Sequence, residues 1–340
     1  MTTMKKTPTI RTLSVAAVLA TAQVAVIAFT SCGGSDNNST TPQNVYIRFS
    51  VDNGNNPATR TATGSNHVRT YKTSTTDGST FLLSVSETDG FPETTNATVA
   101  VTRGLPVESA ADMSDFTTYC YDEGGRVYYE NIASDHDGRL REQKVWPQGK
   151  PLRFYAIHPH DAAKASFTSS PTSFNYTYSV STSVEQQPDL MYASTGMVPF
   201  NSEGLARLHF HHALAAIRVK VGTIGGNVIK INAITLKNVR SKGTLNLPAT
   251  DETATWTFDN TAGNLKDYAI TGLDMTNLTQ GTLLNPNEKT FLMLPQSLDN
   301  ITIEIGVTFS NGTTSLIRQT LTGENPWAAG KTRTYNVNIQ

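Results

Sequence analysis

Apolar and polar residues alternate with a period of two along most of the chain after residue 44. Examples are "NVYIRFSV" (residues 44–51), "LRFYAI", "ARLHFHH", "ITIEIGVTF" and "TRTYNVNI" (residues 332–339). This period, with frequent Val, Ile, Thr, Tyr and Phe, is typical of strands. Turn pairs such as Asp137-Gly138 and Asn311-Gly312 separate many of these runs. Many short strands without intervening helical patterns predict an all-β fold built of antiparallel β-sandwiches.

Chain length and one turn-rich segment divide this pattern. A chain of 340 residues suits roughly two domains. The segment "GMVPFNSEG" (residues 196–204) gathers Pro, Asn, Ser and Gly, and alternating runs lie on both sides of it. We therefore predict an N-terminal sandwich over residues 44–198 and a C-terminal sandwich over residues 199–340.

The N-terminus follows a different pattern. Basic residues come first, an apolar stretch ends at Phe29, and small residues lead to Cys32, which is the order of a secretory signal. The segment "FTSCGGSDNN" resembles the lipobox of bacterial lipoproteins, although leucine is commoner at the position of Phe29. The resemblance implies a signal peptide over residues 1–31, a lipid on Cys32 and a polar tether over residues 32–43. The alternative is an ordinary signal peptide with a chance cysteine.

Charge argues against a nucleic-acid partner, and cysteine content argues against an internal disulfide. Loss of the three basic residues in the signal peptide changes the formal net charge from −1 to −4, because no acidic residue is lost with them. A chain with this charge has no basic footprint for nucleic acid. Cys120 is the one cysteine left beside Cys32, so no internal disulfide is expected.

Candidate catalytic and metal-binding patterns are weak. The segment "AGKT" (residues 329–332) lacks the first glycine of a phosphate-binding loop and leads into a strand pattern instead of a helix. His209 and His211 share a strand face, as do His158 and His160, and such pairs can chelate zinc or copper. No cysteine or clear carboxylate completes either pair, so we predict structural histidines, no metal, no cofactor and no enzyme activity.

The order of several segments resembles the fimbrillin-like family of surface pilins. These segments are "VTRGLPVES", "KVWPQGKPLRFYAIHPH", "DLMYAS", "RLHFHHALAAIRVKV", "LKNVRSKGTLNL", "FLMLPQSLDNITIEI" and "NPWAAGKTRTYNVNI". The resemblance implies two tandem transthyretin-like sandwiches, with His212 at the position of the family's strand histidine. It also implies that Trp327 packs beside a turn at Gly330, and that Lys331 and Arg333 point out of the final strand.

The resemblance further implies an assembly mechanism. Subunits of this family are exported as lipoproteins, an arginine-specific protease removes an N-terminal strand, and a strand of another subunit fills the open groove. In this chain Val45, Ile47 and Phe49 form the apolar face of a matching removable strand. Cleavage after Arg60, with Thr61 as the new first residue, would release it. The alternative is a permanent first strand and an ordinary loop arginine.

These expectations combine into a subunit of a surface fimbria, or pilus, that acts in cell adhesion. A tip or accessory position is expected, because no appended donor strand is visible after the final family strand. The expected partners are other pilus subunits, the outer membrane through the lipid, and a host protein or glycan. The expected location is the cell surface, as an outer-membrane lipoprotein and in the fimbria. The alternative is an uncleaved surface lipoprotein that binds glycans through exposed aromatics such as Tyr128, Tyr129 and Trp146.

Overall fold

Strands carry most of the described chain, as the alternating pattern predicts. The structure is a computed structural model that describes residues 44–53, 69–74, 80–91, 107, 112–160, 167–170, 173–250, 253–258, 261–285 and 289–340. Two short 3-10 helices, η4 (Val184–Gln186) and η5 (Ala262–Asn264), interrupt the strands. In these described ranges no helix is long and apolar enough to cross a membrane. The predicted all-β fold class is confirmed.

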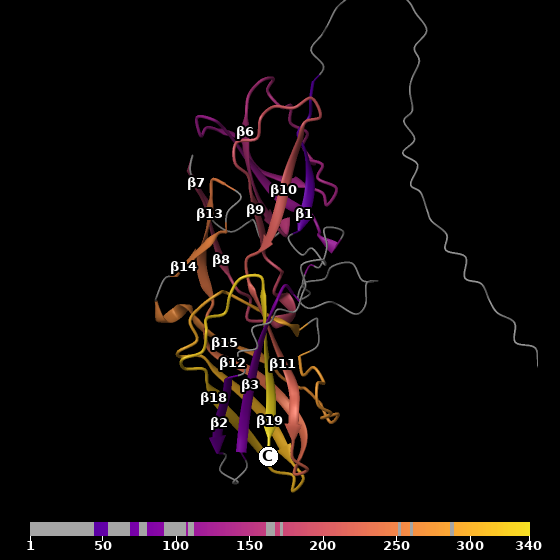
Figure 1. The fold of residues 1–340 in the computed structure, drawn as a ribbon, viewed down its shortest axis with the longest axis vertical. Helices are drawn as coiled ribbons and strands as arrows, with labels where there is room; N and C mark the ends of the chain where they lie inside the picture. Colours follow the sequence, from indigo (N-terminus) through magenta and orange to yellow (C-terminus); the bar gives the residue numbers. More distant parts are fainter. Residues whose placement is uncertain are drawn as a thin grey trace, which may run out of the picture. The chain divides into compact units, whose positions relative to one another are not determined.

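The six-stranded sheet has part of the predicted first strand at one edge. Its spatial order is β1 (Arg48–Asn53), β10 (Leu205–His212), β9 (Met191–Ser194), β6 (Leu152–His158), β4 (Phe116–Asp122) and β5 (Val127–Ser134). Regular pairing begins at Arg48, so the first strand, residues 44–53, consists of β1 and the four residues before it. β1 runs parallel to β10, and the other neighbours in this sheet are antiparallel. Figure 1 shows β1 beside β10, although the two strands are far apart in the sequence.

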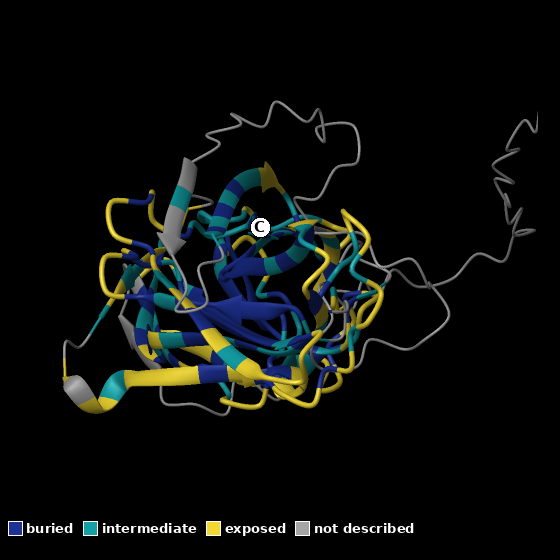
Figure 2. Cartoon of the chain, turned by 90° about the horizontal axis from the view of Figure 1, so that it is seen from below, coloured by how far each residue is buried: buried dark blue, intermediate teal, exposed yellow. Residues whose placement is uncertain are grey.

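Two further sheets share one core. The five-stranded sheet has the order β16 (Phe291–Met293), β11 (Ala215–Ile224), β19 (Lys331–Ile339), β3 (Thr80–Asp89) and β2 (Arg69–Ser74). A four-stranded sheet has the order β15 (Leu265–Ile270), β12 (Val228–Arg240), β17 (Thr302–Phe309) and β18 (Thr314–Thr320). The pair β11 and β19 is parallel, in contrast to the predicted antiparallel pairing. Figure 2 shows buried strands in the interior and exposed residues on the outer elements.

The remaining four-stranded sheet packs on the six-stranded sheet. Its order is β14 (Thr255–Thr257), β13 (Lys242–Pro248), β8 (Ser173–Ser179) and β7 (Phe167–Ser170). The ring of Phe174 on β8 lies 4.7 Å from the ring of Tyr119 and 5.2 Å from that of Tyr155, measured between centroids. These aromatic contacts connect β8 with β4 and β6 of the six-stranded sheet.

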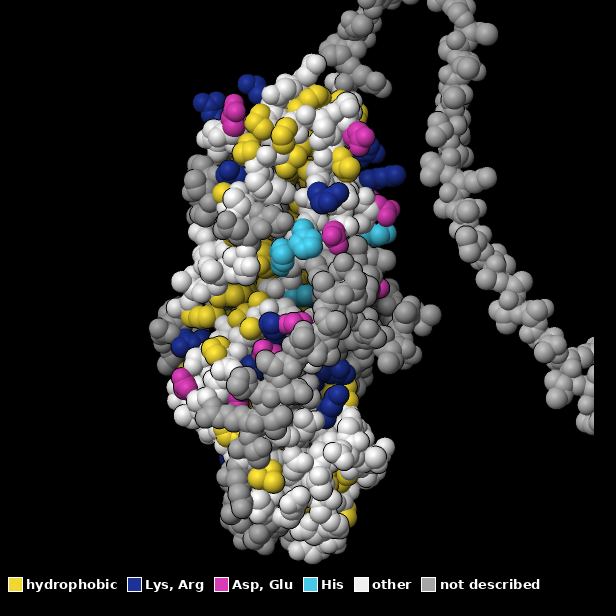
Figure 3. Space-filling view, in the orientation of Figure 1, with side chains coloured by type: hydrophobic (Ala, Val, Ile, Leu, Met, Phe, Trp, Pro, Cys, Tyr) yellow, Lys and Arg dark blue, Asp and Glu magenta, His cyan; other side chains and the backbone are white. Residues whose placement is uncertain are grey.

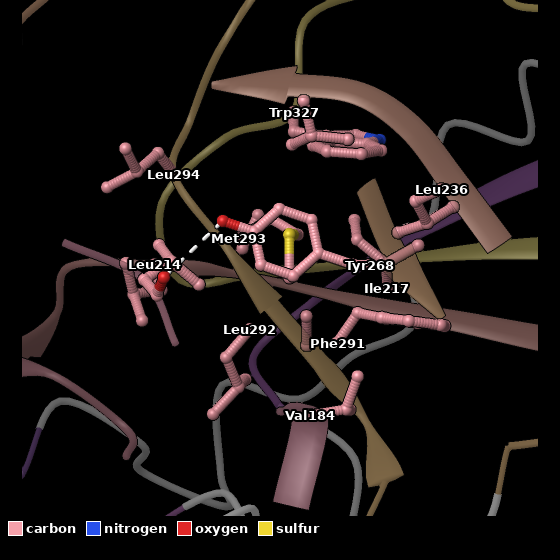
Figure 4. Packing of buried hydrophobic residues seen from close by; sticks show 14 of the residues in the cluster. Val184, Leu214, Ile217, Leu236, Tyr268, Phe291, Leu292, Met293, Leu294 and Trp327 are labelled. Carbon is pink, nitrogen blue, oxygen red and sulfur yellow. Dashed lines mark hydrogen bonds between the residues drawn. The ribbon is translucent and has the colours of Figure 1, made fainter. Parts of the chain in front are cut away.

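One large apolar cluster includes strands of all four sheets. Figure 4 shows part of it, where Tyr268 and Met293 lie among Ile217, Leu236 and Trp327. The six-stranded sheet contributes only one of its faces to this cluster. Its opposite face, with Cys120 and Phe154, belongs to a second cluster. Because both faces are covered, β4 is buried along almost its whole length, and Cys120 is a buried, unpaired cysteine.

The predicted boundary between residues 198 and 199 does not separate the sheets. β3 precedes it, yet β3 pairs along its whole length with β19. β8 precedes it and pairs with β13, whereas β10 follows it and pairs with β9 and β1. Strands from both sides therefore complete the same sheets, and the division into two consecutive domains stays a prediction.

The environment of Arg333 on β19 differs from the prediction. Its side chain was expected to point outward, but only 4% of the residue is exposed. The guanidinium donates hydrogen bonds to Glu324 Oε1 at 2.9 Å and to Glu87 Oε2 at 2.6 Å. The outward prediction is wrong because two carboxylates offset the desolvation of the buried cation. Trp327 is buried as predicted, and its Nε1 donates to the Tyr335 hydroxyl at 2.9 Å.

Candidate functional site

The first strand presents one apolar face to the protein interior. Ile47 and Phe49 are each 3% exposed, and Val45 is partly buried in the same cluster. Tyr46 and Arg48, which alternate with them, are exposed. The alternating sequence therefore places the three predicted residues on one buried face, as the geometry of a strand requires. Removal of this strand stays a prediction.

Aromatic side chains line the slot that receives this face. The Phe49 ring meets Phe154 edge-on at 5.2 Å and Phe116 at 6.3 Å, both measured between centroids. Trp146 contacts Phe154 in turn, with centroids 5.5 Å apart. Burial of a side chain such as Phe49 stabilises the folded chain by about 1.5–3 kcal/mol. The slot is thus an aromatic pocket shaped around Phe49.

The backbone of the first strand is paired on both edges. On one edge β1 follows β10 in parallel register, and Arg48 N donates to Gly204 O at 2.9 Å. On the other edge Ile47 N donates to Lys144 O and Phe49 N donates to Gly138 O, both at 2.8 Å. The second partner is an irregular segment between β5 and β6, not a regular strand. Loss of β1 would leave peptide groups unpaired along both walls of the slot.

Two glycines let the walls of the slot approach the strand closely. Gly138 has φ of +80° and Gly204 has φ of +64°, a region that favours glycine. A Cβ atom on Gly138 would lie 2.0 Å from Phe49 O, and one on Gly204 would lie 2.1 Å from Tyr46 O. The sequence marks both glycines as turn residues. Their contact with the first strand depends on tertiary structure, and sequence reasoning missed it.

Polar side-chain contacts of the first strand lie at its exposed side. His209 Nδ1 lies 3.4 Å from Asp52 Oδ2, and Arg48 Nε donates to Glu203 O at 3.0 Å. Exposed contacts of this kind contribute roughly 0–1 kcal/mol each. The apolar face and the backbone pairing are therefore the main forces that hold the strand.

Three predicted site residues lie outside the described residues. They are Cys32, where lipidation is predicted, and Arg60 and Thr61, which flank the predicted cleavage point. The lipid anchor and the processing step therefore stay predictions.

A buried histidine–aspartate pair lies where β10 ends. His212 Nδ1 is 3.0 Å from Asp189 Oδ2, and the imidazole stacks on Phe91 with ring centroids 4.0 Å apart. Asp189 also accepts a hydrogen bond from Val107 N at 2.8 Å. These contacts agree with the structural role predicted for His212. The partner, Asp189 of "DLMYAS", was not identified from the sequence, because nothing local connects the two segments.

Among the described residues, the other histidines do not complete a metal site. Burial lowers the pKa of His158 to about 4, and Asp189 partly opposes this shift. His209 and His211 lie on one strand face with ring centroids 4.7 Å apart, and Figure 3 shows histidine side chains gathered on the surface. Within the described part of the chain, no three His, Cys, Asp or Glu side chains are arranged to hold a metal ion.

The aromatic residues proposed to bind glycans differ in exposure. Tyr128 is 37% exposed, whereas Tyr129 is 5% and Trp146 is 1% exposed. Trp146 belongs to the second cluster, which surrounds Phe49, and its Nε1 donates to Lys150 O at 2.8 Å. The prediction of three exposed aromatics is wrong for Tyr129 and Trp146, because both fill the second core cluster instead of the surface.

Comparison with solved structures finds cell adhesion and fimbrial proteins that share low sequence identity with this chain. A candidate cell adhesion protein from Bacteroides ovatus is 13% identical, with 88% of this chain and 95% of that chain covered and a TM-score of 0.46. One from Bacteroides uniformis is 15% identical, with 67% and 90% covered and a TM-score of 0.44. The fimbrial anchor protein Mfa2 from Porphyromonas gingivalis is 10% identical, with 64% and 76% covered and a TM-score of 0.29. No curated protein matches the sequence.

The family comparison gives a direct assignment. A family model described as fimbrillin-like matches residues 107–340. This match spans more than half of the chain and takes in strands of all four sheets, from β4 to β19. The chain therefore belongs to the fimbrillin-like family.

Proposed function

We propose that this chain is a subunit of a surface fimbria that acts in cell adhesion and assembles by strand exchange. In this proposal the chain is exported as a lipoprotein on Cys32 and is cleaved after Arg60. The first strand then leaves, and a strand from another subunit takes its place. The observation that carries the proposal is the position of the first strand, an edge strand whose apolar face fills an aromatic slot.

The chemistry of the empty slot explains why another strand would enter it. Departure of Ile47 and Phe49 would open two apolar pockets spaced two residues apart, which is the side-chain repeat of one strand face. The edge of β10 and the segment near Gly138 would offer unpaired backbone groups on either side. A strand with large apolar residues at alternate positions satisfies both needs at once.

The proposal includes a tip or accessory position, in which the subunit accepts a strand. The support is the environment of β19, which pairs with β11 on one edge and with β3 on the other. A strand held on both edges cannot pair with a second subunit without leaving its own sheet. The proposed partners are therefore other fimbrial subunits that donate a strand, together with the outer membrane before cleavage.

The first test is the N-terminus of the protein in surface filaments of its own cells. Intact mass and N-terminal sequencing should give Thr61 as the first residue. An Arg60→Lys variant should remain uncleaved by an arginine-specific protease and should be depleted from the filaments. Filament protein that begins at acylated Cys32 would overturn the processing step.

The second test addresses the slot itself. The purified full chain is cleaved with an arginine-specific protease, and a fluorescent peptide of residues 44–53 is added in excess. The labelled peptide should replace the cleaved strand and remain bound, whereas a peptide that carries Phe49→Ser should not. Equal uptake of both peptides, or of neither, would contradict strand exchange at this slot.

A further inference from the structure

A polar pocket lies at the end of β12, away from the slot of the first strand. Its volume is about 330 Å³, which is at the small end of ligand pockets in proteins. Eight of its ten lining residues are polar, and four of these carry a carboxamide side chain. Arg240 and Asp299 supply one charge of each sign. The two apolar lining residues are Leu265 and Ile301.

One residue that lines the pocket, Asn238, has an unusual backbone conformation. Asn238 has φ of +63°, which is uncommon for a residue other than glycine. The pairing of β12 with β15 shifts register between Leu236 and Val239, so Asn238 lies in a β-bulge. Bulges of this kind redirect side chains and are frequent beside functional sites.

Specific hydrogen bonds fix this conformation. Asn238 N donates to Asp267 Oδ1 at 3.0 Å, and Asn238 Nδ2 donates to Asn300 O at 2.9 Å. The second bond connects β12 with the segment before β17, and both of its residues line the pocket. A sparsely populated backbone conformation persists only where the surrounding structure holds it in place. Residues of this kind are frequent at binding sites.

Hydrogen bonds also hold a second lining residue, Gln296, in place. Gln296 is 5% exposed, its Oε1 accepts from Arg240 N at 2.9 Å, and its Nε2 donates to Leu294 O at 3.1 Å. The Arg240 guanidinium lies over the ring of Phe258, with its central carbon 5.6 Å from the ring centroid. Such contacts hold the walls in place before any ligand arrives, which reduces the entropy lost on binding.

We propose that this pocket binds a terminal sugar of a glycan. Carboxamides both donate and accept hydrogen bonds, as sugar hydroxyls do, and a guanidinium and a carboxylate can each pair with neighbouring hydroxyls. A phosphate-rich ligand would need more cations than the single arginine, and a lipid or apolar peptide would need a larger apolar floor. This binding site is separate from the site of strand exchange, because no pocket residue belongs to the second cluster, which surrounds Phe49.

The test is saturation-transfer NMR of the purified full chain with five free sugars, each at millimolar concentration. The sugars are D-galactose, D-mannose, L-fucose, N-acetylglucosamine and N-acetylneuraminic acid. At least one should receive saturation from the protein, and titration should give its affinity. Arg240→Ala should weaken that affinity roughly tenfold or more, since a hydrogen bond from a charged group is lost.

Two further variants keep the test independent of folding. Asn300→Ala removes an exposed carboxamide but keeps the backbone carbonyl that accepts from Asn238, and it should also weaken binding. Arg207→Ala removes an exposed arginine of β10 outside the pocket and should leave binding unchanged. Absence of binding by all five sugars, or equal binding by Asn300→Ala and the parent chain, would overturn the proposal. Neither result would affect the predicted Thr61 terminus.

Discussion

The first described strand and the last are held in opposite ways. Each pairs in parallel with one of two consecutive strands, β1 with β10 and β19 with β11. β1 lies at the edge of its sheet, and an irregular segment with a glycine covers its other side. β19 lies inside its sheet, and β3 pairs with it from Lys331 to Ile339.

This difference indicates which strand can leave at lower cost. Removal of residues 44–53, which include β1, breaks one regular pairing and empties the pockets of two deeply buried side chains, Ile47 and Phe49. Removal of β19 would break two regular pairings and expose a buried arginine with its two carboxylates. In the proposed assembly we therefore expect β1 to be the strand that is exchanged and β19 to stay in its sheet. Four experiments test how differently β1 and β19 are held.

The largest effect is expected at the buried charges of β19. Arg333→Met should lower the free energy of unfolding by about 3–5 kcal/mol, because it leaves Glu324 and Glu87 without their cation. Lys331→Met is the matched control on the same strand, and loss of its exposed contact with Asp89 should cost less than about 1 kcal/mol. Urea unfolding of both variants measures the difference. Equal losses would mean that the Arg333 network does not anchor β19.

A large but local effect is expected in the slot. Phe49→Ala should cost about 3–5 kcal/mol in the intact chain, because it leaves a cavity against Phe116 and Phe154. Hydrogen exchange should accelerate in β1 and in residues 138–146, while β19 stays protected. Uniform acceleration in every sheet would contradict the separate behaviour of β1.

Acid should loosen the six-stranded sheet, because His158 on β6 is buried. Its folded pKa of about 4 lies below the ordinary value of 6.5, so the unfolded state takes up the proton first. The stability present above pH 6.5 is therefore lost as the pH falls towards 4, by at most about 3 kcal/mol. Urea unfolding at pH 7 and pH 4.5 tests this, and His158→Gln should flatten that part of the profile. If the free energy of unfolding of the variant depended on pH as in the parent chain, groups other than His158 would cause the acid effect.

A smaller effect is expected at the wall glycines. Gly204→Ala should cost about 1–3 kcal/mol and displace β1, because the new Cβ would collide with Tyr46 O. Gly272→Ala is the matched control, since Gly272 has a similar φ of +69° and nothing within 4 Å of the added Cβ. Hydrogen exchange of β1 should rise in the first variant alone. The same increase in both would assign the effect to backbone strain.

Local pattern predicted the elements well, but not their partners. The alternating run at residues 332–339 agrees with β19 to within one residue, whereas the run at residues 44–51 only overlaps β1, which begins at Arg48 and ends at Asn53. They could not predict the parallel pairings of β1 with β10 and of β19 with β11, because register between distant segments depends on tertiary packing. The same limit explains why the domain boundary at residue 198 does not follow the sheets.

The candidate site shows the same division. Alternation alone identified the apolar face of Val45, Ile47 and Phe49, since successive side chains of a strand point to opposite sides. Exposure was predicted less well. Trp146 lies in the second buried cluster instead of at the surface. Arg333 pairs with Glu324, nine residues before it, and with Glu87 of the distant strand β3.

The amino-acid sequence was enough to predict the all-β class, the apolar face of the first strand and the turn residues at Gly138 and Gly204. These follow from the two-residue period of a strand and from the backbone freedom of glycine, both of which act locally. The folded chain was needed to see that β1 lies at an edge, that β19 is enclosed, and that Asn238 and Gln296 line one polar pocket. Those outcomes depend on contacts between segments far apart in the chain, where burial of apolar surface and compensation of buried polar groups select one arrangement.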